Sequence, residues 1–113
     1  MDEKNKVLLV DDEVDFAQTM AYWLETNGNS VVTANNGPDA LKIIRETPPD
    51  IVFLDLNMPV MNGVEVLKEI RKINKDLPVI IISAYLENME MVSEATAYGI
   101  SGVFHKSKDF QEG

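Results

Sequence analysis

Apolar residues along the chain fall into short runs that alternate with stretches of helical spacing. The runs are rich in β-branched residues and predict five strands, at 6–10, 30–34, 50–55, 78–84 and 102–106. Apolar positions that recur every three or four residues predict four helices, at 14–27, at 38–46, around 66–70 and at 87–98. This strand–helix alternation predicts an α/β fold, in which a parallel sheet carries helices on both faces.

Three of the strand runs, at 6–10, 50–55 and 78–84, are apolar almost without interruption. A strand that is covered on both faces has no side that needs polar residues, so these three are expected in the interior of the sheet.

A polar or charged residue stands where each of four apolar runs ends. Asp11 and Asp12 follow the first run, Asp55 ends the third, Ser83 lies at the end of the fourth and Lys106 ends the fifth. Open parallel sheets bind ligands outside the carboxyl ends of their strands. We therefore expect these groups to meet at one edge of the sheet.

Acids that converge in this way repel one another. Two carboxylates about 5 Å apart repel by about 3 kcal/mol at an effective dielectric near 20. Either some of these acids keep a proton or a cation lies among them, and oxygen ligands without His or Cys favour Mg²⁺ or a similar hard ion. With the ammonium of Lys106 and the hydroxyl of Ser83 nearby, the site suits phosphoryl transfer, with Asp55 as the nucleophile.

Composition narrows the possible functions. The chain has 113 residues, enough for one domain, and a net charge of −9, which argues against nucleic-acid binding because phosphate contacts need a basic face. The absence of cysteine excludes disulfides and thiol catalysis. No apolar run is long enough to span a bilayer and the first residues lack a signal-peptide pattern, so we expect a cytoplasmic location without membrane contact.

The order of these features resembles the receiver domain of two-component response regulators. The matching segments are "VLLVDDE" at 7–13, "DIVFLDLNMPVMNG" at 50–63, "PVIIISA" at 78–84 and the lysine at 106. The resemblance runs nearly from end to end, so it implies a single receiver domain over 1–113, in which 112–113 are expected to be additions to the native chain.

The resemblance implies a doubly wound, flavodoxin-like sheet with strand order 2-1-3-4-5. It also implies that Asp55 accepts a phosphoryl group from the phosphohistidine of a sensor histidine kinase or phosphotransfer protein, and that the phosphorylated state changes binding to an output domain or partner. Such a domain promotes its own phosphorylation and dephosphorylation and is not a turnover enzyme. The implied Mg²⁺ ligands, with Mn²⁺ as a substitute, are Asp12, Asp55, the backbone carbonyl of Asn57, and Asp11 through water. The implied phosphate contacts are Ser83, the backbone of Ala84, and Lys106.

Three departures from the family pattern change what we expect. Ser107 stands where the family has a proline in a cis peptide, and a cis bond there would cost about 3–4 kcal/mol, so we expect a trans Lys106–Ser107 bond. Val103 occupies the position of the family's switch aromatic, whereas Phe104 is expected to face the opposite side of the strand. The segment 107–113 is too short for a full fifth helix, which predicts a truncated helix and favours homodimers through the uncovered sheet surface.

Tyr85 lies two residues after Ser83 and is predicted to slow dephosphorylation by shielding the path of the attacking water.

Two alternative functions stay open. A phosphatase of the haloacid dehalogenase type would need a second acid two residues after Asp55, where Asn57 stands. A degenerate receiver that binds partners without phosphorylation is suggested by the unusual "VFHKS" segment at 103–107.

Overall fold

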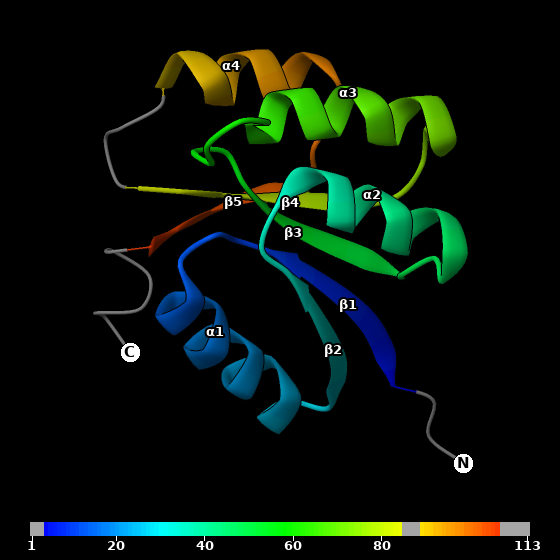
Figure 1. Ribbon diagram of the computed structural model, residues 1–113, viewed down its shortest axis with the longest axis vertical. Coiled ribbons are helices and arrows are strands. Elements are labelled where there is room, and N and C mark those ends of the chain that lie inside the picture. Colours follow the sequence, from blue (N-terminus) through cyan, green and yellow to red (C-terminus); the bar gives the residue numbers. More distant parts are fainter. Residues whose placement is uncertain (1–3, 85–88, 107–113) are drawn as a thin grey trace.

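The computed structural model describes residues 4–84 and 89–106, and within them the chain alternates strictly between strands and helices (Figure 1). The strands are β1 (Asn5–Val10), β2 (Asn29–Ala34), β3 (Ile51–Asp55), β4 (Val79–Ser83) and β5 (Gly102–His105). The helices are α1 (Val14–Thr26), α2 (Gly37–Glu46), α3 (Gly63–Ile73) and α4 (Met89–Ala97). The predicted helix at 14–27 thus ends one residue earlier, and Gly28 follows it with a φ of 92°.

The strands form one parallel sheet in the order β2-β1-β3-β4-β5, which confirms the predicted doubly wound topology. Figure 1 shows α1 on one face of the sheet and α2, α3 and α4 on the other. The predicted interior strands are confirmed, because β1, β3 and β4 are buried over most of their lengths.

Side chains that alternate along each strand supply two separate cores. On the side of α2, α3 and α4 lie Leu8, Val10, Val52, Leu54, Val79 and Ile81. On the side of α1 lie Val7, Leu9, Phe53 and Ile82, against Ala17, Met20 and Leu24 of the helix. Since successive side chains of a strand point to opposite faces, a strand covered on both faces has to be apolar throughout.

The same alternation separates two neighbours in β5. Val103 packs against the core on the α3 and α4 side, whereas Phe104 packs against the core on the α1 side. The prediction that Phe104 faces away from the side of Val103 is confirmed. The aromatic ring of this strand therefore lies against α1.

The loop between β3 and α3 brings backbone segments very close together. A Cβ on Gly63 would lie 2.7 Å from the Cα of Leu56 and would also overlap the carbonyl of Asp55. By contrast, a Cβ on Gly37 would meet only side-chain atoms, those of Val66 and Met61. The α3 helix then begins with a capping box, in which Asn62 and Glu65 each accept the other's backbone N–H.

The loop before α3 contains one residue in an unusual backbone conformation. Val60 has a φ of 69° and a fully exposed side chain, an unusual conformation for a β-branched residue.

Arg71 of α3 donates hydrogen bonds to four backbone carbonyls, two beyond the end of α3 and two beyond the end of α4: those of Asn74, Leu77, Tyr98 and Gly99. Arg71 therefore fastens the carboxyl ends of the two helices together.

Several predictions concern the parts of the chain outside the described ranges. The start of the predicted helix at 87–98, the truncated fifth helix at 107–113 and the trans bond between Lys106 and Ser107 all fall there. Within residues 4–84 and 89–106, no helix combines the length and the apolar character that crossing a bilayer requires.

Candidate phosphoryl-transfer and metal site

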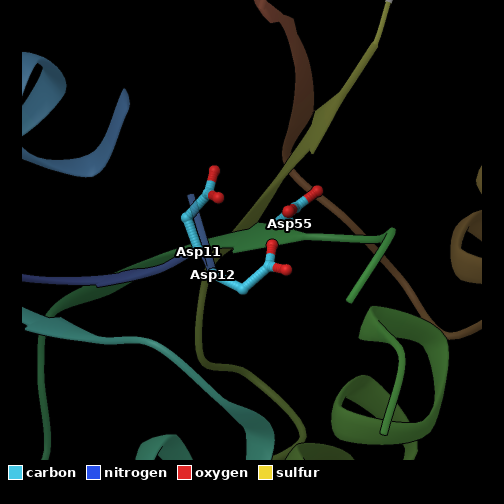
Figure 2. Close-up of side chains that lie close together, drawn as sticks. All are labelled: Asp11, Asp12 and Asp55. Atoms are coloured by element: carbon cyan, nitrogen blue, oxygen red, sulfur yellow. The ribbon is translucent and has the colours of Figure 1, made fainter. Parts of the chain in front are cut away.

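Three carboxylates gather where β1 and β3 end (Figure 2). Oxygen atoms of Asp11, Asp12 and Asp55 all lie within 4.8 Å of one another. Asp11 and Asp55 are 1% and 2% exposed, and Asp12 is more exposed than either. The sheet register accounts for this convergence, because Val10 of β1 is paired with Leu54 of β3, so the next residues on both strands are acids.

Lys106 reaches the same point from the end of β5. Its Nζ lies 3.1 Å from Oδ2 of Asp11 and 3.6 Å from Oδ2 of Asp55, and it also pairs with the carboxylate of Glu13. The Lys106 side chain is only 15% exposed. Four sequence-predicted residues, Lys106 and the three aspartates, thus come together in the folded chain.

Burial and mutual repulsion change the protonation of these acids. Burial, followed by repulsion from Asp11, raises the pKa of Asp55 to about 7, although Lys106 and the N–H of Asn57 act in the opposite direction. Burial also raises the pKa of Asp11, against the hydrogen bond from the Glu13 N–H and the charge of Lys106. Burial lowers the pKa of Lys106, but its acidic neighbours, Glu13 first, outweigh that effect and raise it. One ammonium therefore does not fully compensate the two buried acids.

The donor set fits a hard divalent cation. All the candidate ligands are carboxylate oxygens, and no His or Cys belongs to the cluster in the described part of the chain. Oδ2 of Asp11 lies beside the Lys106 ammonium, yet it accepts no hydrogen bond from any described residue. The ammonium is the counter-charge of that oxygen, but it is one positive charge among three carboxylates within 4.8 Å of one another, so a divalent cation would offset the remaining repulsion.

Asn57 contributes a contact that the sequence analysis missed. Its backbone N–H donates to Oδ1 of Asp55 over 3.2 Å, which fixes the plane of the Asp55 carboxylate. The prediction from the sequence concerned only the Asn57 carbonyl. The signal was present, because an aspartate often accepts the N–H of the residue two positions further on.

Ser83 lies beside Asp55 in the sheet. Asp55 is paired with Ile82 of β4, and Ser83 is the next residue, 1% exposed. Its hydroxyl donates to the carbonyl of Ala84 over 3.1 Å. The roles of Ser83 and Ala84 as phosphate contacts remain predictions. Tyr85 lies outside the described residues, so its predicted shielding role is also untested.

Two neighbours of Lys106 were not predicted from the sequence. Glu13, the N-cap residue of α1, pairs with its ammonium, and the ring of Phe16 lies 4.7 Å from Nζ. Both are about ninety residues away from Lys106 along the chain. Glu13 is the third acid of the segment "VDDE", and this position was the only sign of its role in the sequence. No feature of the sequence indicated a role for Phe16.

The chain is similar to several curated proteins that are much longer. It is 43% identical over 84 residues to a protein-glutamate methylesterase/protein-glutamine glutaminase of Clostridium acetobutylicum, covering 73% of this chain and 24% of that protein. It is 42% identical over 88 residues to a CpxR homologue of Haemophilus influenzae, a transcriptional regulatory protein, covering 78% and 38%. The Regulator of RpoS of Escherichia coli is 36% identical over 101 residues, covering 89% and 30%. The chain therefore spans between about a quarter and two fifths of these relatives.

Solved structures of similar size superpose over most of the chain. The chemotaxis protein CheY4 of Vibrio cholerae aligns with a TM-score of 0.86 and 30% identity, covering 97% of this chain and 98% of that one. The receiver domain of NtrX from Brucella abortus aligns with a TM-score of 0.83 and 34% identity, covering 89% and 85%. The family model described as the response regulator receiver domain matches residues 7–112. Together with the sheet order and the acids at its edge, this match establishes that the chain belongs to the response regulator receiver domain family.

Proposed function

We propose that this chain is a phosphorylation-controlled switch in which Asp55 accepts a phosphoryl group from a phosphohistidine. The donor is a sensor histidine kinase or a histidine phosphotransfer protein. The observation that carries the proposal is the burial of Asp55 within 4.8 Å of two further acids and 3.6 Å from the Lys106 ammonium. In such surroundings a charged Asp55 carboxylate is unfavourable unless a cation lies among the acids. A divalent cation at this point would also attract the phosphoryl group.

In the proposed transfer, a carboxylate oxygen of Asp55 forms a bond to phosphorus while the phosphorus–nitrogen bond of the donor breaks. The bonding electrons stay on the imidazole nitrogen of the donor. The Asn57 N–H, 3.2 Å from Oδ1, holds the carboxylate in a fixed orientation for this attack. Lys106 supplies a positive charge for the phosphoryl oxygens, and Ser83 and the Ala84 backbone are the expected hydrogen-bonding groups.

The acid cluster would hold the metal ion. Asp12, Asp55 and the Asn57 carbonyl are the proposed direct ligands of Mg²⁺, and Asp11 contacts it through water. Mg²⁺ bound there supplies positive charge that offsets the repulsion among the carboxylates and neutralises phosphoryl oxygens, and Mn²⁺ can replace it. The approach of the three carboxylates to within 4.8 Å of one another supports this assignment.

Later hydrolysis of the aspartyl phosphate by water returns the switch to its resting state. The phosphoryl group adds charge and acceptor oxygens, so it shifts the balance between conformations that bind partners differently. The length of the relatives, two of them regulators by name, supports an output domain or partner as the receiver of this signal. We place this signalling in the cytoplasm.

The direct test is phosphorylation with Mg²⁺ and a small phosphodonor such as acetyl phosphate, followed by intact-mass measurement. We expect one phosphoryl group per chain, lost on removal of Mg²⁺ and absent from Asp55→Asn. Asp76→Asn is the matched control, because Asp76 precedes the start of β4, at the opposite end of this strand from Ser83, and should react as the wild type does.

Equal reaction of Asp55→Asn and the wild type would refute the proposal. Calorimetry without detectable Mg²⁺ binding, combined with no phosphorylation, would favour a receiver that acts only through protein contacts. Sustained multiple-turnover hydrolysis of phosphomonoesters would favour the phosphatase alternative.

A further inference from the structure

The ammonium of Lys106 is not centred on Asp55. It lies closest to the carboxylate of Glu13, then 3.1 Å from Asp11, and 3.6 Å from Asp55. The Phe16 ring also lies beside it, with the ring centroid 4.7 Å from Nζ. Both Glu13 and Phe16 belong to the start of α1, whereas Asp55 ends β3.

We propose that Glu13 and Phe16 form a holding position for Lys106, which the lysine leaves when a phosphoryl group is attached to Asp55. This inference rests on the proposed phosphorylation of Asp55. It makes Glu13 and Phe16 positioning residues, which act on the transfer through Lys106. It also gives the switch a route from the phosphorylated site to α1.

Glu13 holds Lys106 in a way that is easily reversed. Its backbone N–H donates to Oδ1 of Asp11 over 2.8 Å, so the main chain fixes Glu13 beside the acid cluster. Its side chain is 63% exposed, and solvent-exposed ion pairs contribute little to stability. A phosphoryl group on buried Asp55 offers Lys106 a stronger electrostatic partner at a position that solvent screens less.

Phe16 connects the position of Lys106 to the packing of α1 against β5. Its ring also packs edge-on against Phe104, with centroids 6.4 Å apart and planes inclined by 61°. Phe104 lies in β5, two residues before Lys106, and faces the α1 side. When Lys106 withdraws from the Phe16 ring, the cation–π contact is lost while the Phe16–Phe104 pair stays, so the ring environment changes on the α1 face.

This route differs from one through Val103. Val103 occupies the family's switch-aromatic position, but it carries no ring and packs on the side of α3 and α4. Among the described residues, the ring of Phe16 beside Lys106 and its partner ring of Phe104 both lie on the opposite face. The geometry thus favours a phosphorylation signal that reaches α1.

A nuclear magnetic resonance experiment tests the holding position itself. Protons of the Lys106 side chain that lie over the Phe16 ring should be shifted upfield in the wild type. Phe16→Leu should abolish this shift, whereas Phe16→Trp, which keeps an aromatic ring, should retain it. Addition of beryllium fluoride and Mg²⁺, which mimic the phosphorylated state, should reduce the shift in the wild type.

Kinetics test the effect on transfer. If Lys106 has to leave the holding position, Glu13→Gln and Phe16→Leu should each increase the rate of Asp55 phosphorylation by about two- to fivefold. Phe16→Trp should react no faster than the wild type, because indole binds cations more strongly than benzene does. Asp15→Asn is the control for Glu13→Gln, since it removes the same charge from the same helix turn without a contact to Lys106 among those described.

The outcomes separate this inference from the proposed function. Absence of an upfield shift in the wild type, or a shift that the phosphate mimic leaves unchanged, overturns the inference even if Asp55 is phosphorylated. Equal acceleration by Asp15→Asn and Glu13→Gln also overturns it. If Phe16→Leu removes the shift but the wild type never accepts phosphate, the proposed function is refuted. Only the resting position of Lys106 is then established.

Discussion

Replacing Asp55 with asparagine should stabilise the metal-free protein at pH 8, although it removes the proposed phosphate acceptor. In the folded chain, burial and Asp11 raise the pKa of Asp55 from 3.8 to about 7. The folded state therefore holds this proton more tightly than the unfolded state does. The free energy of unfolding accordingly falls as the pH rises from about 4 to about 7, and levels off above that range.

The size of this effect follows from the pKa change. At 1.36 kcal/mol per pKa unit, a change from 3.8 to about 7 corresponds to at most about 4 kcal/mol of lost stability. The variant does not gain the whole of this stability, because the N–H groups of the buried asparagine amide need hydrogen-bond acceptors. We therefore expect Asp55→Asn to exceed the wild type by about 2–3 kcal/mol at pH 8, and to differ from it by less than about 1 kcal/mol at pH 5.

Urea unfolding followed by circular dichroism, with a metal chelator present at both pH values, measures this difference. Repeating the series with Mg²⁺ should stabilise the wild type more than the variant, because a ligand that binds only the folded state adds RT ln(1 + [Mg²⁺]/Kd). Asp15→Asn serves as the control, since Asp15 is an exposed acid whose replacement should cost no more than about 1 kcal/mol at either pH. A metal-free Asp55→Asn that is less stable than the wild type at pH 8 would refute this reasoning.

Three further substitutions test the surroundings of the site. Gly63→Ala should destabilise the chain by more than about 2 kcal/mol in thermal unfolding, whereas Gly37→Ala should cost clearly less because only side chains must shift; equal costs would contradict this. Arg71→Lys should cost about 1–3 kcal/mol in urea unfolding, against less than about 1 kcal/mol for Lys72→Ala, which removes a surface ion pair. Val60→Asn should raise stability by about 1 kcal/mol, because asparagine tolerates a φ of 69°, and a lower melting temperature would count against strain there.

Much of the fold could be predicted from the alternation of apolar runs with helical spacing. The strands at 6–10, 50–55 and 78–84 were recognised as interior strands, because a position buried on both faces leaves no place for a polar residue. Element ends were less certain by one or two residues, since the last turn of a helix depends on local caps such as the left-handed Gly28. The strand order itself came from the resemblance and was confirmed by the sheet.

The sequence by itself determined which groups end the strands, and parallel strands necessarily bring those ends to one edge. That is why Asp11, Asp55 and Lys106 could be assigned to one site before their distances were known. Only the tertiary structure decided where the Lys106 ammonium rests, because a long flexible side chain chooses among several carboxylates by its local packing. The contacts of Lys106 with Glu13 and Phe16 join residues about ninety positions apart, and no periodicity along the chain encodes a contact of that kind.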